Sequence, residues 1–277
     1  MIAVTGATGQ LGGRVARELA ARGVPQRLVV RDPSRAPRLE HVEVVSVPSY
    51  GDTAAMRDGL RGVDTLFLVS GREQQDRVAE HVSAIDAAVA AGVERIVYTS
   101  FQAAAPETTF TFGRDHFHTE EHIRSTGLRS TFLRDNLYLD YLPVFVGEDD
   151  VIRGPAGNGR VAAVARDDVA DVAVGVLTTE GHDGQAYDVT GPEALTLSEA
   201  SAELSRAWGR PISYEDETLE EARASRASSG AETWEIEGWV TSYAAIANGD
   251  LARVCDTVER IAGHSPVSLA ELLRRTS

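Results

Sequence analysis

The residues best suited to chemistry stand at the N-terminus, where three glycines follow an apolar run. Residues 1–13 read Met-Ile-Ala-Val-Thr-Gly-Ala-Thr-Gly-Gln-Leu-Gly-Gly, a buried strand leading into a G-x-x-G-x-x-G turn. Such a turn lets a phosphate approach the backbone, because a Cβ atom would block it and the N–H groups of a helix N-terminus bind anions. The turn predicts a dinucleotide site that includes Gly6, Thr8, Gly9, Gln10, Leu11 and Gly12.

The context of this turn favours nucleotide binding, although glycine-rich turns also end strands for purely structural reasons. An amphipathic run with Leu11, Val15 and Leu19 follows the turn. A second apolar run at 26–30 then closes a βα unit of about 30 residues, the length typical of a dinucleotide-binding motif.

The end of the second apolar run indicates which dinucleotide binds. It reads Val-Val-Arg-Asp at 29–32, with Arg35 one turn further on. An arginine here accommodates the 2′-phosphate of NADPH, whereas an aspartate accepts a hydrogen bond from the ribose 2′-hydroxyl of NADH. We therefore predict that Arg31 and Arg35 select NADPH over NADH. Two alternatives stay open: Arg31 could pair with Asp32 or Asp52, and Asp32 could turn to the ribose and admit NADH.

The ends of later apolar runs supply further candidates, because ligands of parallel sheets bind beyond the carboxyl ends of the strands. The predicted contacts there are Val69, Ser70 and Gly71, and further along Thr99, Ser100 and Phe101. The second group would place a hydroxyl and an aromatic ring near the nicotinamide. Gly71 also fits an ordinary turn, and Ser100 a strand-end cap.

The elements that must position these residues alternate between strand and helix. Apolar runs lie at 2–5, 28–31, 42–47, 65–69, 95–100 and 130–134, with helical periodicity between them. One long helix is predicted over about 74–91, ending at Gly92 as its C-cap. This alternation predicts an α/β fold, a Rossmann-like doubly wound parallel sheet with helices on both faces.

The second half of the chain is less regular and predicts a smaller, mixed α/β lobe. We expect a Rossmann domain over 1–142, with strands added from later segments, and a substrate-binding lobe over 143–277. A helix start at Asp167, a strand at 187–189 and a capping box from Thr196 to Glu199 are its clearest signals. Residues 215–229 fit either an exposed helix or a mobile flap.

Composition excludes several classes of partner. The 277 residues carry 42 acidic and 27 basic side chains, a net charge of −15, and no basic stripe, which argues against nucleic acid and anionic membranes. The single Cys255 excludes an internal disulfide, and the N-terminus shows no signal region, so we expect a cytoplasmic protein. His118 and His122 share a helical face without an evident third ligand, so no metal is expected.

Several motifs resemble the atypical short-chain dehydrogenases of the NmrA-like type, within the branch of type-2 quinone oxidoreductases and triphenylmethane reductases. The resemblance rests on the glycine turn, Val-Arg-Asp-Pro at 30–33, Gly-Val-Asp at 62–64, Ala-Gly-Val at 91–93, Val-Tyr-Thr-Ser at 97–100, His-Phe-His-Thr-Glu at 116–120 and Phe-Leu-Arg-Asp-Asn-Leu-Tyr at 132–138. It spans nearly the whole chain. Asp135 departs from the asparagine expected in that branch, which puts in doubt any hydrogen bond assigned to it.

The resemblance implies hydride transfer from NADPH, yet this chain has no lysine at all. The Tyr-x-x-x-Lys dyad of typical short-chain dehydrogenases therefore cannot exist here. His116 and Glu120 take its place in the sequence, four residues apart on one helical face. His116 could donate protons with Glu120 orienting it, or it could be structural. The catalytic candidates are His116, Tyr138 and Ser100.

Without the dyad to supply a proton, the hydride acceptor must be one whose reduced form is stable by itself. Hydride transfer to a ketone makes an alkoxide about as basic as hydroxide (pKa ~15.7 for water), whereas a quinone gives a phenolate-like anion with a pKa of about 10. A positioned acid is worth roughly 10²–10⁴-fold in rate, which matters far more for the ketone. Quinones and cationic dyes are therefore favoured, and the candidate walls for such a flat substrate are Phe101, Phe117, Tyr138, Tyr141 and Trp234.

Two other functions stay open. NmrA-like proteins include redox sensors that bind NADP(H) without turnover, and a biosynthetic reductase of an imine, enone or carbonyl would use His116 as its proton donor. The expected partner is a small conjugated molecule, and a homodimer is one open assembly state.

Overall fold

The computed structural model describes residues 1–276, which form two compact units. The first unit comprises Met1–Ser100, Asp115–Arg134 and Val169–Tyr187. The second unit comprises Phe101–Arg114, Asp135–Asp168 and residues 188–276. The units are thus built from interleaved segments, whereas the sequence suggested one boundary near residue 142.

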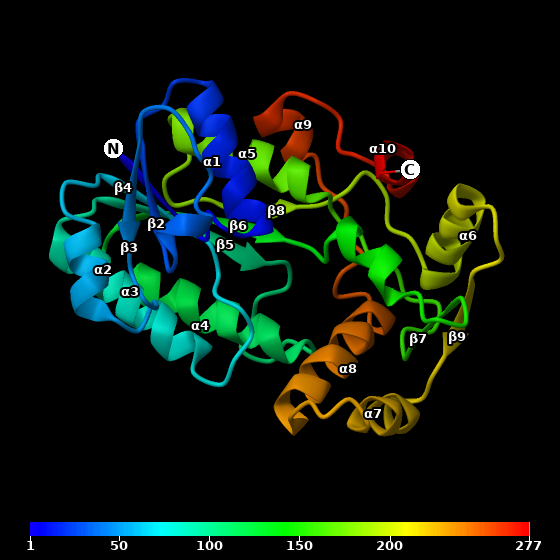
Figure 1. The fold of residues 1–277 in the computed structure, drawn as a ribbon. Helices are drawn as coiled ribbons and strands as arrows, with labels where there is room; N and C mark the ends of the chain where they lie inside the picture. Colours follow the sequence, from blue (N-terminus) through cyan, green and yellow to red (C-terminus); the bar gives the residue numbers. More distant parts are fainter. Residues whose placement is uncertain (277) are drawn as a thin grey trace. The chain divides into compact units, whose positions relative to one another are not determined.

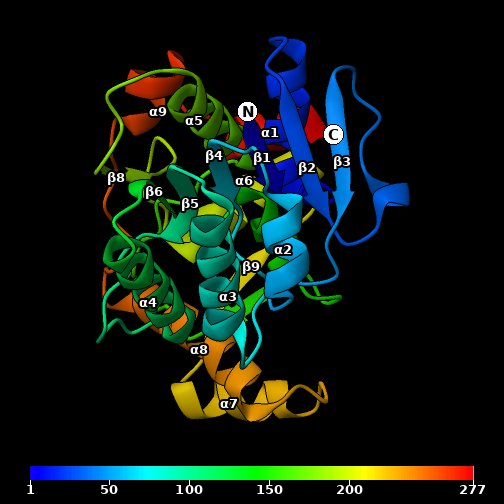
Figure 2. The ribbon, with the colours of Figure 1, turned by 90° about the vertical axis from the view of Figure 1, so that its left-hand side faces the viewer.

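A seven-stranded sheet forms the centre of the first unit, in the order β3-β2-β1-β4-β5-β6-β8 (Figures 1 and 2). The strands are β1 (Ile2–Thr5), β2 (Gln26–Val30), β3 (Val42–Ser46), β4 (Thr65–Leu68), β5 (Arg95–Phe101), β6 (Arg129–Asp135) and β8 (Ala186–Val189). Strands β1 to β5 pair in parallel, and the strand order reverses between β1 and β4. Ligands of such sheets bind at this switch point.

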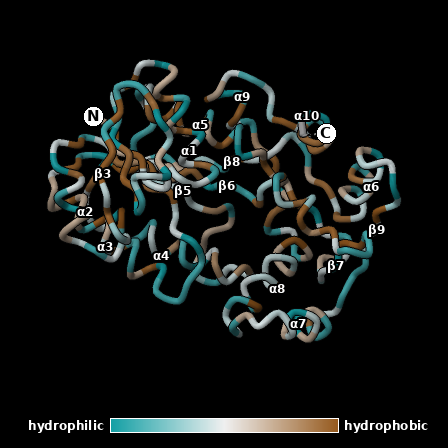
Figure 3. The backbone as a smooth tube through the Cα atoms, in the orientation of Figure 1, coloured by the Kyte–Doolittle hydropathy of each residue, from teal (hydrophilic) through white to brown (hydrophobic). Residues whose placement is uncertain are grey.

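Helices cover both faces of the sheet, which confirms the predicted doubly wound fold. Figure 1 shows α1 (Gln10–Ala21) and α5 (Arg166–Thr178) on one face and α2 (Thr53–Gly59), α3 (Arg77–Ala91) and α4 (Thr111–Ser125) on the other. Side chains alternate along each strand, so that Ala3 and Leu66 pack with Met56 and Ile85 in one core cluster. Figure 3 shows the hydrophobic colour concentrated along these strands.

The predicted helix boundaries are close to those observed. Helix α3 ends at Gly92, whose φ of 82° gives the left-handed C-cap that the sequence predicted. It begins at Arg77, later than predicted, because residues 69–76 form the loop after β4. The capping box between Thr196 and Glu199 is also confirmed, at the start of α6 (Leu197–Trp208).

The second unit has its own core and a two-stranded parallel sheet of β7 (Val151–Gly154) and β9 (Ser213–Asp216). Its other elements are α6, α7 (Leu219–Ala227), α8 (Thr233–Ala247), α9 (Thr257–Ala262), α10 (Leu269–Thr276) and the 3-10 helix η2 (Leu139–Phe145). The core includes Ile152, Leu204 and Ile246. Helix α7 occupies most of the 215–229 segment, and Ala222 is its buried residue. Within residues 1–276, no helix has the length and apolar character needed to cross a bilayer.

Candidate functional site

A pocket of about 410 Å³ lies in the first unit at the carboxyl ends of β1, β2 and β4. Its lining includes the predicted residues Gly6, Thr8, Gly9, Gln10, Leu11, Gly12, Arg31, Val69, Ser70 and Gly71. Four other predicted cofactor residues, Arg35, Thr99, Ser100 and Phe101, are not among the residues that line it. Residues from three separate strand ends therefore meet where the sequence predicted a dinucleotide.

Two glycines of the turn at the pocket are required by the backbone conformation and by close packing. Gly6 has a φ of +63°, a left-handed conformation that side chains rarely adopt. A Cβ atom on Gly12 would lie 2.5 Å from the carbonyl oxygen of Gly6, so α1 could not pack this closely with any other residue there. Gly9 is the N-cap of α1 and offers no capping side chain, which leaves N–H groups of the first helical turn for an anion.

Arg31 lines the pocket at the end of β2, and the neighbouring carboxylates bond elsewhere. Asp32 accepts hydrogen bonds from the backbone N–H and the hydroxyl of Ser34, which lower the pKa of its carboxyl. Asp52 caps α2 by accepting from the N–H of Ala55 at 3.0 Å. Within the described part of the chain, no ion pair joins Arg31 to either aspartate. Its guanidinium is thus available to a ligand phosphate.

The turn at residues 69–71 forms the wall of the pocket after β4. The N–H of Val69 donates to Thr5 Oγ1 at 2.9 Å, and the N–H of Ser70 donates to Thr99 Oγ1 at 2.7 Å. Thr99 therefore shapes the pocket from behind instead of lining it.

Sequence reasoning missed several lining residues that follow β3 and β4. They are Ser49, Tyr50, Arg72, Gln74 and Glu80, together with apolar side chains such as Met56. The Tyr50 hydroxyl donates to the carbonyl of Val69 at 2.8 Å, and burial raises the pKa of Tyr50 to about 12. The end of the third strand was a usable signal, since it belongs to the same sheet edge.

Ser100 and Glu120 lie in an ion-pair cluster of the first unit whose two arginine side chains are 25% and 42% exposed. The Ser100 hydroxyl donates to Glu120 at 2.6 Å, and the same carboxylate accepts from Arg134 at 2.6 and 2.8 Å and from Arg124 at 2.8 Å. The side chain of Glu120 is fully buried. The carboxylate of Glu120 is thus held by Arg124, one turn further along α4, and by Arg134 of β6, and its role in orienting His116 stays a prediction.

His116 is enclosed by protein groups that fix its protonation. Arg77 Nη2 lies 3.2 Å from its Nε2, and the Tyr98 hydroxyl lies 3.0 Å from its Nδ1. Because arginine only donates, Nε2 must be the acceptor and Nδ1 must carry the hydrogen. Burial, followed by the charge of Arg77, lowers the pKa of His116 well below its usual range. The enclosure of this imidazole favours the structural alternative, and proton donation by His116 stays a prediction.

Tyr138 belongs to the second unit, where its hydroxyl donates to the carboxylate of Asp135. Burial, followed by the charge of Asp135, raises the pKa of Tyr138 well above its usual range. The guanidinium of Arg166 stacks on the rings of Tyr138 and Tyr141 at 4.4 and 4.3 Å. Asp135, the departure from the family pattern, thus has a defined role: its carboxylate accepts a hydrogen bond from the Tyr138 hydroxyl.

The other predicted substrate walls are divided between the units. In the second unit, the rings of Phe101, Phe110, Phe112 and Trp234 form a chain with centroid distances of 5.0, 5.6 and 6.0 Å. Phe101 is almost completely buried, as a core residue is. In the first unit, the ring of Phe117 packs edge-on against His118.

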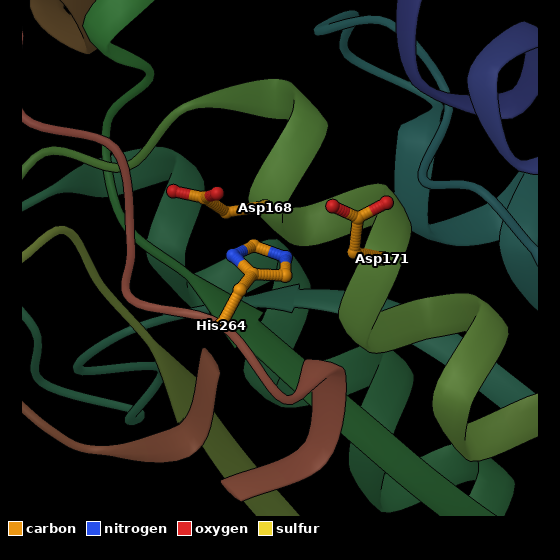
Figure 4. A group of neighbouring side chains, drawn as sticks. All are labelled: Asp168, Asp171 and His264. Atoms are coloured by element: carbon orange, nitrogen blue, oxygen red, sulfur yellow. The ribbon is translucent and has the colours of Figure 1, made fainter. Parts of the chain in front are cut away.

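Asp168 is a buried carboxylate of the second unit that accepts a hydrogen bond from the backbone. It accepts the N–H of Val267 at 2.8 Å and so anchors the segment before α10. Burial raises the pKa of Asp168, and the imidazole of His264 lies beside it (Figure 4).

Comparison with known proteins gives one family and several close relatives. A family model described as NAD(P)H-binding matches residues 6–180. Quinone oxidoreductase 2 of Escherichia coli is 34% identical over 278 residues, covering 98% of this chain and 96% of that protein. The (4-alkanoyl-5-oxo-2,5-dihydrofuran-3-yl)methyl phosphate reductase of Streptomyces griseus is 42% identical over 229 residues, covering 80% of this chain and 79% of that protein.

Two solved structures of such enzymes match this chain over its full length. The Escherichia coli NADPH-dependent quinone oxidoreductase complexed with NADPH has a TM-score of 0.91 at 33% identity, covering 100% of this chain and 99% of that one. The Citrobacter triphenylmethane reductase complexed with NADP(H) has a TM-score of 0.89 at 30% identity, covering 100% of both chains. The resemblance read from the sequence motifs is thereby confirmed.

Proposed function

The chain belongs to the NAD(P)H-binding family, and from this membership we propose that it is an NADPH-dependent oxidoreductase that transfers hydride to a conjugated acceptor such as a quinone or a cationic dye. The observation that carries the proposal is the pocket in which the glycine turn and Arg31 meet. NADPH supplies the hydride. The relatives named above, which reduce a quinone or a triphenylmethane dye, support this reaction class.

The pocket residues divide the binding of NADPH between them. The backbone N–H groups of Gln10 and Leu11, in the first turn of α1, bind the pyrophosphate, because no side chain caps them, whereas the N–H of Gly9 donates to the carbonyl of Gly6 at 2.8 Å. Arg31 binds the 2′-phosphate, which a guanidinium holds in a bidentate manner. Ser70 and Gly71 form the wall against which the dinucleotide lies.

The acceptor follows from which groups could donate a proton. His116 is neutral and enclosed, and the Tyr138 proton is directed at a carboxylate. Neither arrangement favours protonation of an alkoxide, the product of an ordinary ketone. A quinone or a cationic dye needs no such donor, because its reduced form carries the electron pair as a stable anion or neutral molecule. The aromatic side chains Tyr141 and Trp234 are our candidates for substrate contacts.

A second candidate is the reduction of a conjugated enone. The Streptomyces griseus relative, at 42% identity, is named a reductase of a dihydrofuranone methyl phosphate, a conjugated lactone. Hydride transfer to a conjugated enone produces an enolate, which delocalises its charge as a quinone product does. The same absence of a proton donor is therefore compatible with this substrate class. We further propose that the protein acts in the cytoplasm on small molecules. A homodimer is one open assembly state, and the mass of the protein in solution would decide it.

Steady-state oxidation of NADPH and NADH tests the proposal, with a simple quinone, a triarylmethyl dye and a conjugated lactone as acceptors. We expect turnover with NADPH and at least one acceptor. Arg31→Ala should raise the KM for NADPH about tenfold, the value of a charge-assisted bidentate contact, and leave that for NADH nearly unchanged. Arg38→Ala is the matched control, since Arg38 is exposed and does not line the pocket. Tight NADPH binding without oxidation by any acceptor would refute the enzyme and favour a redox sensor.

A further inference from the structure

The backbone of Gly71, in the pocket wall, is held from both sides by buried side chains. Its N–H donates to Nε2 of His81 at 2.9 Å, and its carbonyl oxygen accepts from Nε of Arg77 at 2.9 Å. The side chain of His81 is fully buried and Arg77 is 3% exposed. Both come from α3, whereas the two preceding N–H groups of the turn donate to threonines of β1 and β5. The turn therefore depends on side chains for its shape.

The hydrogen positions around His81 follow from its partners. Since Nε2 accepts from Gly71, Nδ1 must carry the hydrogen, and it lies 2.9 Å from Oγ1 of Thr119. The Thr119 hydroxyl in turn donates to the carbonyl of Asp115 at 2.8 Å. In this series of three hydrogen bonds, each donor has an acceptor. Thr119 therefore selects the tautomer of His81 whose Nε2 can accept the hydrogen bond from the N–H of Gly71.

Arg77 is a buried guanidinium whose hydrogen bonding is incomplete. Its Nη2 donates to the imidazole of His116, and its Nη1 lies 3.6 Å from the carboxylate of Asp115, beyond hydrogen-bond distance. Burying a guanidinium with incomplete hydrogen bonding is unfavourable. Its bond to the carbonyl of Gly71 is the contact that reaches the pocket wall.

We propose that His81 and Arg77 are positioning residues, which hold Gly71 in the conformation that receives the dinucleotide without touching it themselves. This inference rests on the proposed function, since NADPH is the ligand that the pocket takes. Without an acceptor from residue 81, the receptive turn leaves a buried N–H group unpaired, and the free protein shifts to other conformations. Binding then weakens by the fraction of molecules that keep the receptive turn.

Titration with NADPH, followed by its fluorescence, tests this for two variants of one residue. His81→Leu should raise the Kd of NADPH about tenfold, because it removes the acceptor for a buried N–H group. His81→Gln should restore most of the affinity, because its side-chain oxygen accepts from Gly71 and its amide donates to Thr119. In turnover, His81→Leu should raise the KM for NADPH with little change in kcat, since the lost contact acts on binding.

His122→Leu is the control for the loss of a histidine hydrogen bond between α3 and α4. The His122 imidazole bonds Asp86 of α3 at 2.8 Å, so it links the same two helices as His81 but has no bond to the turn. We expect a wild-type Kd for this variant. An equal loss of affinity in His122→Leu and His81→Leu would overturn the inference, as would a folded His81→Leu protein with wild-type affinity or a His81→Gln protein as weak as His81→Leu.

Thr119→Val gives a second test should His81→Leu not fold. It keeps His81 but removes the partner that selects its tautomer, so we expect the Kd to rise about threefold, a part of the full loss. An unchanged Kd overturns the inference. The wild-type titration separates the two levels of the argument: absence of NADPH binding by the wild type refutes the proposed function, whereas equal binding by wild type and variants refutes only the positioning role.

Discussion

The two buried histidines of the first unit should make the protein sensitive to mild acid. Burial, followed by the charge of Arg77, lowers the pKa of His81 to about 3, and the same causes lower that of His116 well below its usual range. In the unfolded chain both titrate near 6.5. Below that pH the unfolded state takes up protons that the native state excludes, so the free energy of unfolding falls as the pH falls.

The magnitude follows from linkage. Each such histidine contributes stability that is complete above pH ~6.5 and is lost at about 1.4 kcal/mol per pH unit as the pH falls toward its native value. A fall in pH from ~7.5 to ~5 should therefore lower the free energy of unfolding by about 2 kcal/mol for one such histidine and by about 4 kcal/mol for two. This is a large fraction of the typical total of roughly 5–15 kcal/mol.

Urea unfolding of the wild type and of His81→Gln across this pH range measures the effect. Carboxylates titrate in both proteins, so the difference between their free energies of unfolding isolates His81. We expect that difference to move by about 2 kcal/mol against the wild type from pH ~7.5 to ~5. Circular dichroism and tryptophan fluorescence must give coincident transitions for the free energies to be valid. A difference that stays constant within about 0.5 kcal/mol would refute the assignment of a neutral, buried His81.

Three further substitutions test other parts of the site. Gly12→Ala places a Cβ atom 2.5 Å from the carbonyl oxygen of Gly6, so a calorimetric titration should show NADPH affinity reduced by at least about tenfold; wild-type affinity would contradict the close packing of α1. Glu120→Gln removes the charge that Arg124 and Arg134 share, and because these guanidinium groups are 42% and 25% exposed, thermal unfolding should show a loss of only about 1 kcal/mol; an unchanged Tm would show that the ion-pair cluster is dispensable. His116→Gln should keep the kcat for quinone reduction within about tenfold, since an enclosed neutral imidazole donates no proton, and a loss of about 10²–10⁴-fold would restore it as the acid.

The sequence alone determined the features that depend on local pattern. The glycine turn and the alternation of apolar strands with helices predicted the doubly wound sheet, because backbone conformation and side-chain periodicity are properties of short segments. Arg31 could be placed in the pocket for the same reason, since the end of β2 is defined by its own few residues. The absence of lysine excluded the usual catalytic dyad without any structure.

Only the tertiary structure decided the partners of the buried polar groups. Glu120 and His116 share a helical face, yet Arg134 of β6 bonds the first and Arg77 of α3 bonds the second. A buried charge or imidazole must be satisfied by whatever group the fold brings within about 3 Å, and that distance is set by packing across the sheet. Local spacing carries no record of it, which is why the sequence alone could not name Arg77 and Tyr98 as the partners of His116.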